Sequence, residues 1–308
     1  MLADAVTAYV ALQRTAGFAF HSQALALESF AAFSESKGAS YVRAALAVEW
    51  AGLARSVPQR ARRLGMATRF ARHLRAEDAR HEIPPPVFGA EKRTRPVPYI
   101  LSQEEIQRLV RAASQSGYRT LRRETYRTLF ALLASTGLRV SEAIHLRVDD
   151  ITPDGLVIRC SKFRKSRLVP LHPTVEQGLE RYLEQRRPYA PTESHVFVSL
   201  RRKPLIVQDV ECAFRTAATA IGLPQRPVRP RPTPHSLRHA FAVRALQTCP
   251  DGRDAITEHM LALSTYLGHA KVTDTYWYLT GTTPLLATAG KRFEKFAGPA
   301  RGGDHEKA

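Results

Sequence analysis

The sequence predicts a mainly α-helical protein of two domains, with a small β-hairpin in the second domain. Most of the chain places apolar residues at the three- and four-residue spacing of amphipathic helices. A proline-rich stretch, residues 85–98, interrupts this pattern, because proline cannot continue a helix, and is predicted to be the linker between the two domains. Further along, two short runs of aliphatic residues flank a basic loop, which is typical of a hairpin. A chain of 308 residues is long enough for two domains with separate cores.

The first domain, residues 1–84, is predicted to be a helical bundle. The last of its helices has no acidic residue and carries arginines on several faces. Such a helix in a basic chain favours contact with a phosphate backbone over a merely solvated face. The candidate DNA-binding residues on it are Arg60, Arg62, Arg63 and Arg69. The predicted helices cover about 5–12, 21–36, 41–53 and 59–76.

The second domain, residues 99–298, begins with a capping box at Ser102 and Glu105. A tail at 299–308 is predicted to be disordered. Strands are expected at 156–160, 167–171 and 196–198. Helices are expected at about 103–115, 120–135, 174–187, 207–221, 256–266 and 284–297, with a short one from Ser141 and one that carries His235.

Composition limits the classes of function. The chain has 46 lysines and arginines against 28 acidic residues, a formal charge of +18, which attracts polyanions. Its three cysteines are widely spaced and suggest neither a disulfide framework nor a zinc site, so a reducing cytoplasm is expected. The N-terminus lacks the features of a signal peptide, and no run of 18 apolar residues predicts a membrane span.

Several residues of the second domain suit attack on a phosphodiester. Arginines such as Arg139 and Arg238 can hold the charged oxygens through paired hydrogen bonds. His235 and Arg238 are three residues apart, so they project from one face of a helix. A tyrosine such as Tyr278 can be the nucleophile if the site assists loss of its proton. Each residue alone has an ordinary explanation, as a helix cap, a surface cation or a core aromatic. Their combination in one basic chain instead favours a site that attacks a phosphodiester.

The order of these motifs resembles the catalytic domain of the tyrosine recombinases, the phage-integrase and Xer-like family. The resemblance spans about 98–285 and implies a helical core-binding domain and a catalytic domain that clamp DNA. The first domain is similar to the core-binding domain in size and kind only. The matching stretches are Thr136-Gly137-Leu138-Arg139-Val140-Ser141-Glu142, the hairpin from Lys162 to Arg167-Leu168-Val169-Pro170-Leu171, His235-Ser236-Leu237-Arg238-His239, and Leu267-Gly268-His269 with Tyr278.

The resemblance implies how the DNA phosphate is held. Arg139 and Arg238 would clamp the scissile phosphate, and Glu142 would orient the site. Apart from the resemblance, Arg164 and Lys165 in the basic hairpin are further candidate DNA-binding residues. No metal and no nucleotide cofactor would be required, because the covalent link conserves the energy of the broken bond.

The resemblance also implies how bonds are broken. Tyr278 would form a 3′-phosphotyrosyl link, and Lys162 would protonate the leaving 5′ oxygen. His235 and His269 would assist proton transfer. One alternative remains open at this point: Lys165 is a rival acid, because glycines that are common beside the family's lysine are missing here. For the nucleophile, the family's nine-residue step from the Gly-His histidine selects Tyr278.

Other departures concern local geometry. Tyr276 lies two residues before Tyr278 and could be mistaken for the nucleophile. Ser236 stands where an aspartate is common in the family. The segment 249–263 is longer than in compact members and is expected to add a loop.

The expected function is that of a site-specific recombinase or integrase, with the recombinase of a mobile element as one form of it. The expected location is the cytoplasm, on the nucleoid. Expected partners are double-stranded DNA and further copies of the chain in a tetrameric synapse, with a helper recombinase or accessory protein as an additional candidate. No membrane partner is expected. The alternatives are an inactive DNA-binding protein of the same fold and a type IB topoisomerase-like enzyme. A metal-dependent nuclease is disfavoured, because its carboxylate clusters are not seen among these cationic motifs.

Overall fold

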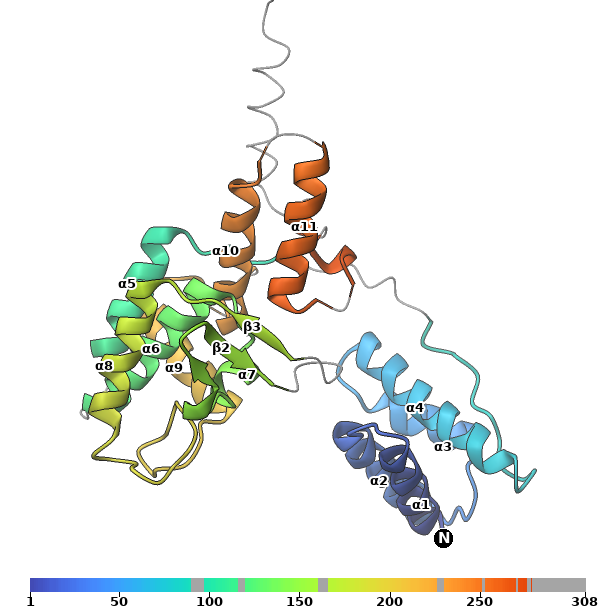
Figure 1. Cartoon of the computed structure of the whole chain (residues 1–308). Coiled ribbons are helices and arrows are strands. Elements are labelled where there is room, and N and C mark those ends of the chain that lie inside the picture. The colour runs from blue at the N-terminus through green and yellow to red at the C-terminus, as the bar shows by residue number, and fades with distance from the viewer. Residues whose placement is uncertain are drawn as a thin grey trace, which may run out of the picture. The chain divides into compact units, whose positions relative to one another are not determined.

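The predicted fold class is confirmed: helices dominate the structure, and the second part of the chain has one small antiparallel sheet (Figure 1). The chain divides into two compact units, Met1–Arg95 and Pro96–Ala308, each with its own hydrophobic core. Within the described residues, no helix is both long and apolar enough to cross a membrane. This computed structural model describes residues 1–89, 97–115, 120–159, 166–225, 230–250, 253–269, 271–275 and 278.

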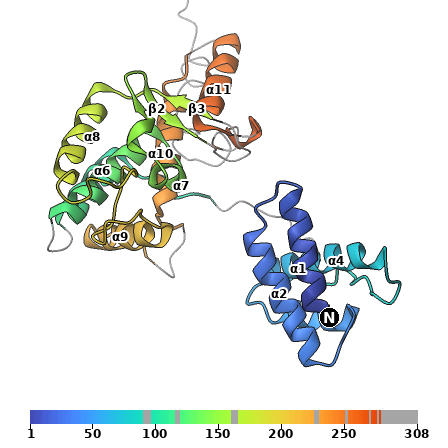
Figure 2. The same cartoon turned by 60° about the horizontal axis from the view of Figure 1, so that its bottom comes forward.

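The described part of the first unit, residues 1–89, is a bundle of four helices, as predicted, and Figure 2 shows α1 and α2 side by side within it. Its core is built on the aromatic side chains of Phe30, Trp50 and Phe70, which are almost completely buried. The third helix begins three residues later than expected, because Val42 instead pairs with residues 81–82 through its main-chain groups. The helices are α1 Leu2–Thr15, α2 His21–Ser36, α3 Ala44–Gly52 and α4 Val57–Arg75.

The start of the proline-rich stretch lies against α4. Phe88 packs on the core of the first unit, and the Thr68 hydroxyl donates a hydrogen bond to the Pro84 carbonyl oxygen (3.4 Å). Between this segment and α4 lies a groove of about 260 Å³, which Arg69 and Arg72 help to line. Residues 84–89 are therefore part of the first unit's surface.

The second unit is organised around α6, which packs against α5, α8 and α10. Leu129, Phe130 and Leu133 of α6 are buried in the largest core cluster of the described chain. The C-terminal part of the unit brings α10 and α11 together, and α11 also contacts β3 (Figure 1). The helices are α5 Gln103–Gln115, α6 Thr120–Thr136, α7 Val140–Ile144, α8 Pro173–Arg186, α9 Val207–Ala220, α10 Pro234–Gln247 and α11 Arg253–Leu267.

Among the described residues the sheet has three short strands, β1 Ile151–Thr152, β2 Gly155–Ile158 and β3 Arg167–Val169, paired antiparallel in that order. The two-residue β1 was not predicted, because it is too short for an alternating pattern. The strand β3 ends two residues before its predicted end at 171, since Pro170 has no N–H group to continue the ladder. The register pairs Ile158 with Arg167, so the residues next to the basic hairpin lie opposite each other.

The predicted strand at 196–198 was wrong. The segment is buried, but it forms only isolated bridges at His195 and Val198. Its buried aliphatic and aromatic side chains produced a strand-like pattern without a neighbouring strand that could complete a ladder. The predicted helix at 284–297 and the tail at 299–308 lie outside the described residues.

Candidate phosphodiester site

The first site arginine stands in the tight turn between α6 and α7. Gly137 ends α6 with a positive φ of 63°, a conformation that favours glycine, and Arg139 caps the start of α7. The Arg139 N–H group donates to Glu142 Oε2 (2.9 Å), and its Nη1 donates to Glu142 Oε1 (2.7 Å). Its Nη2 donates to the Gly268 carbonyl oxygen (2.8 Å). The guanidinium is thus fixed at both ends of its fork.

The second arginine, Arg238, comes from α10 and is only 2% exposed. Its Nη1 and Nη2 donate to the carbonyl oxygens of Gly137 and Leu267, each at 2.7 Å. Burial, together with nearby Arg139, lowers the pKa of the Arg238 guanidinium to about 10. The group therefore stays positively charged at neutral pH, in a place where little water screens it.

His235 stands three residues before Arg238 on the same face of α10. Its ring keeps contact with solvent, but surrounding protein atoms and then the charges of Arg238 and Arg139 lower its pKa to about 4. The imidazole is consequently neutral at pH 7 and can accept or donate one hydrogen bond at each nitrogen according to its tautomer.

His269 follows the end of α11. Its Nδ1 lies 2.7 Å from the hydroxyl oxygen of Thr275, whose side chain is fully buried, and this contact fixes the ring. Burial, then the charges of Arg238 and Arg139, lowers the pKa of His269 to about 4. A second neutral imidazole thus faces the two arginines.

The phenol of Tyr278 is buried beside these groups, with 3% of the residue exposed. Its ring stacks with that of His269 at a centroid separation of 6.4 Å. The hydroxyl lies 3.0 Å from Nδ1 of His239, a residue one helical turn after His235 on α10. The rings of His235 and His239 are also in contact, with centroids 4.4 Å apart. A short series of polar rings therefore leads from the tyrosine hydroxyl to His235.

Behind Arg139, one carboxylate joins two guanidinium groups. Glu142 accepts hydrogen bonds from Arg139 and a paired set from Arg167 of β3, at 3.0 Å from Nη1 and 2.9 Å from Nη2. Burial by itself would raise the pKa of the Glu142 carboxyl, but hydrogen bonds from Arg167 and Arg139 lower it to about 2. Glu142 is therefore ionised throughout the physiological range.

The structure brings together six of the predicted site residues: Arg139, Glu142, His235, Arg238, His269 and Tyr278. The predicted acid Lys162 and its hairpin neighbours Arg164 and Lys165 lie outside the described residues, as does Tyr276. In the described chain, no group of three or more His, Cys, Asp or Glu side chains is arranged to hold a metal ion.

Sequence reasoning gave no role to two residues that touch this cluster, Arg167 and His239. The position of each residue in its strand or helix could have indicated that it lies near the site. Side chains alternate along a strand, so Arg167 shares its face with the buried Val169 and is directed towards the protein. His239 follows His235 by four residues, which places both on one helix face.

The predicted DNA-binding arginines of α4 are not equivalent. Arg60 donates to the Ala54 carbonyl oxygen (2.9 Å), and Arg63 lies over the ring of Trp50, 5.1 Å from its centre. These half-buried side chains stabilise the first unit itself. Arg62 and Arg69 are exposed and lie seven residues apart, which places them on one face of the helix. These two are the better placed to meet an external anion.

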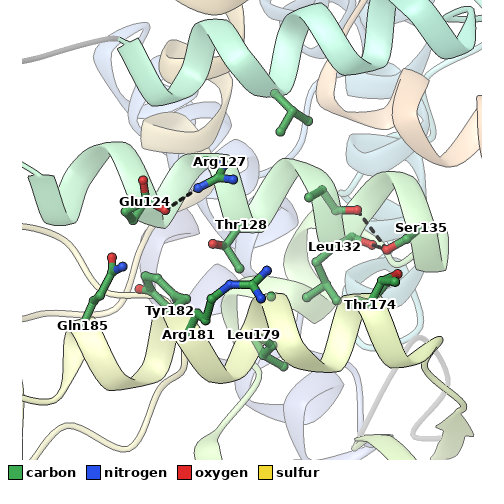
Figure 3. Close-up of a pocket in the computed structure, with 14 residues that line it drawn as sticks. Glu124, Arg127, Thr128, Leu132, Ser135, Thr174, Leu179, Arg181, Tyr182 and Gln185 are labelled. Carbon is green, nitrogen blue, oxygen red and sulfur yellow. Dashed lines mark hydrogen bonds and ion pairs between the residues drawn. The ribbon is translucent and has the colours of Figure 1, made fainter.

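A cavity of about 400 Å³ lies elsewhere in the second unit, between α6 and α8 (Figure 3). Leu132, Leu179 and Tyr182 contribute to its walls, while Arg127 and Glu124 form an ion pair at 3.0 Å beside it. None of the predicted site residues that the structure describes lines this cavity. It is thus distinct from the cationic cluster.

Two arginines, two neutral histidines and a tyrosine on adjoining elements form a site for an anionic ester that a phenol can attack. This arrangement, on a helical unit with a small antiparallel sheet, is the one expected of a DNA strand-transfer enzyme of the tyrosine type. The chain belongs to the phage integrase family, whose family model matches residues 100–283. Members of this family of tyrosine recombinases cleave and rejoin DNA, and this chain is such an enzyme.

The similarity extends over nearly the whole chain. The chain is 37% identical to the putative integrase/recombinase y4rB of Sinorhizobium fredii over 95% of this chain and 96% of the relative. It is 32% identical to the tyrosine recombinase XerD of Corynebacterium glutamicum, over 68% and 64% of the two chains.

Solved structures share the fold. The Tn1549 transposon integrase in complex with transposon right end DNA has a TM-score of 0.65 at 18% identity, covering 96% of this chain and 99% of that one. A lambda integrase tetramer bound to a Holliday junction has a TM-score of 0.63 at 18% identity, covering 88% and 77%.

Proposed function

We propose that the chain is a site-specific recombinase in which Tyr278 attacks a DNA phosphodiester held by Arg139 and Arg238. The observation that supports this most directly is that both guanidinium groups reach the end of α11, where Leu267 shares a hydrophobic cluster with the buried Tyr278 side chain. Arg238 reaches the same end of α11 that Arg139 contacts, one carbonyl group apart. Each guanidinium has five N–H donors, and the protein contacts of each engage its two terminal nitrogens, so donors remain for phosphate oxygens.

The reaction that we propose is a transesterification. The Tyr278 oxygen forms a bond with phosphorus, the bond from phosphorus to the 5′ oxygen breaks, and the strand is left with a 3′-phosphotyrosyl link and a 5′ hydroxyl. The phenol gives up its proton and the 5′ oxygen gains one, so no oxidant or energy source is consumed. Rejoining is the reverse reaction with a 5′ hydroxyl from another strand.

Each remaining group has a proposed role that follows from its charge. His235 and His269, neutral at pH 7, can accept a proton or donate a hydrogen bond to the phosphate. Lys162 is the proposed acid towards the 5′ oxygen, with Lys165 as its rival. Arg62 and Arg69, on the exposed face of α4, are proposed to contact the DNA backbone.

The assembly that we propose is a tetramer on two DNA duplexes, located on the nucleoid. Full-length similarity to a putative integrase/recombinase and the fold of a transposon integrase support an origin in a mobile element. A helper recombinase or accessory protein is retained as a proposed partner. The convergence of six candidate residues argues against an inactive DNA-binding protein, in which the loss of at least one would be expected. Similarity to recombinases along the whole chain argues against a topoisomerase.

The test is covalent trapping on nicked duplexes taken from DNA that flanks the gene, in the presence of a chelator and without nucleotide. Wild type, Tyr278→Phe and Tyr276→Phe are compared through a protein–DNA band that survives denaturant. We expect the band to disappear only in Tyr278→Phe, with DNA affinity retained. Loss of the band only in Tyr276→Phe would show that the other tyrosine is the nucleophile. Tight, specific binding without any band would support the inactive alternative.

A further inference from the structure

The C-terminal end of α11 anchors three arginines at once. A helix leaves its last carbonyl groups without partners in the helix, and their dipoles concentrate negative charge there. Here three consecutive carbonyl groups each accept a hydrogen bond from an arginine on a different segment of the chain. The pairs are Tyr266 O with Arg167 Nε (2.7 Å), Leu267 O with Arg238 Nη2 (2.7 Å) and Gly268 O with Arg139 Nη2 (2.8 Å).

Arg167 is the arginine of this set that sequence reasoning left without a role. Its side chain is 10% exposed, and its Nε, Nη1 and Nη2 all donate to protein oxygens, on Tyr266 and Glu142. Because all three nitrogens of Arg167 already donate to protein oxygens, its guanidinium has fewer donors left for a DNA phosphate than Arg139 or Arg238. Its contacts instead point to a role through its neighbours.

The main chain makes room for Arg167 at one residue. Gly268 has a φ of +65°, and a β-carbon on it would stand 2.9 Å from Nη1 and 3.1 Å from Cζ of Arg167. The guanidinium therefore occupies the space that any other residue at 268 would fill. This packing explains the glycine of the Gly-His pair, and it joins β3 to the end of α11.

The shared carboxylate sets the charge that Arg139 presents. Glu142 is 6% exposed on its side chain and lies between Arg139 and Arg167, so the three groups carry a net charge of +1. If Arg167 were missing, the same buried carboxylate would have Arg139 as its remaining guanidinium partner among the described residues. The pair would be neutral, and Glu142 would be free to draw the Arg139 fork away from Gly268 and from a bound phosphate.

We propose that Arg167 is a positioning residue, which holds Glu142 and the end of α11 so that the Arg139 guanidinium faces the scissile phosphate with its charge available. This inference rests on the proposed phosphate-holding role of Arg139. On this proposal, β3 contacts the phosphate-holding residues in two ways: through the Glu142 carboxylate and through the end of α11.

The test compares single-turnover cleavage by Arg167→Gln and Arg167→Lys, each with Glu142 intact and in a Glu142→Gln background. Arg127→Gln is the matched control, because it also removes an arginine from an ion pair but lies at the cavity between α6 and α8. Displacing a positioned group by about 1 Å can lower a rate by about 100-fold, and we expect a loss of that order for Arg167→Gln with DNA affinity unchanged. Arg167→Lys should recover part of the rate, and Arg127→Gln should cleave as wild type does.

The Glu142→Gln background separates positioning from other roles. If Arg167 acts largely through Glu142, adding Arg167→Gln in this background should lower the rate by far less than the roughly 100-fold expected with Glu142 intact, because only the contact with the end of α11 remains to be lost. An equal loss in both backgrounds, or a wild-type rate for Arg167→Gln, would overturn the proposal. If Arg167→Gln does not fold, Arg167→Lys in the two backgrounds gives the same comparison.

A second measurement needs no DNA. The Nε–Hε NMR signal of Arg139, assigned through Arg139→Lys, should report a rigid side chain in wild type and a mobile one in Arg167→Gln. A signal that stays rigid would overturn the proposal whatever the DNA chemistry. Failure of the proposed function would be distinct, since wild type would then form no adduct that depends on Tyr278.

Discussion

Replacing Gly268 by alanine should damage both the stability and the activity of the second unit. The change adds one methyl group at a residue whose φ is +65° and whose β-carbon position is already occupied by the Arg167 guanidinium. Gly222 offers a matched control in the same unit. It also has a positive φ, 76°, but a β-carbon there would meet nothing within 4 Å.

The expected free-energy costs differ because only one site has a steric conflict. A left-handed backbone costs an alanine about 1–2 kcal/mol, and this term applies to both substitutions. At Gly268 the guanidinium must also move from 2.9 Å to an ordinary contact distance, which strains its bonds to Tyr266 and Glu142. Weakening a hydrogen bond to a charged group costs about 1.5–3 kcal/mol, so Gly268→Ala should destabilise the protein by about 2.5–5 kcal/mol in all.

Urea denaturation followed by circular dichroism gives the free energy of unfolding of each variant, and covalent trapping gives the cleavage rate. Under conditions where both variants are folded, Gly268→Ala should cleave about 100-fold more slowly than wild type, because Arg139 loses its fixed position. Gly222→Ala should cleave normally. Equal destabilisation by the two alanines, or normal cleavage by Gly268→Ala, would refute the reasoning that this glycine exists to admit Arg167.

Two further predictions concern pH and salt. His235 and His269 have pKa values of about 4 in the folded protein against an ordinary 6.5, so the unfolded chain binds protons first as the pH falls, and the free energy of unfolding should decrease from pH 7 to pH 4. Urea titrations at several pH values should show a smaller decrease for His269→Asn than for wild type. An unchanged decrease would contradict the lowered pKa of His269. For DNA binding, Arg62→Ala and Arg69→Ala should each reduce the slope of log affinity against log salt by about 0.9. Arg63→Ala should leave that slope unchanged and lower the free energy of unfolding by about 0.5–1 kcal/mol, because the contact of Arg63 with Trp50 is lost. A reduced slope for Arg63→Ala would show that Arg63 contacts DNA.

The order of helices could be predicted from the sequence because helix formation depends mainly on residues that are close together in the chain. Apolar residues at helical spacing and glycines at helix ends depend on neighbours within a turn or two. The same holds for the relation of His235 to Arg238, which share one helix face. The strand expected at 196–198 failed for the opposite reason, since a strand needs a partner that is distant in sequence, and that segment has only isolated bridges.

The residues that could carry phosphodiester chemistry were also determined by the sequence alone, through the motifs that contain Arg139, Arg238 and Tyr278. Only the tertiary structure decided how they are held. Arg139 binds a carbonyl oxygen 129 positions away, and Arg167 binds another 99 positions away. No local pattern encodes such pairs, because they arise when packing buries the end of α11 and its unpaired carbonyl groups require donors. The sequence therefore predicted the candidate reacting groups, and the tertiary structure supplied the helix end and the shared carboxylate that hold the two arginines.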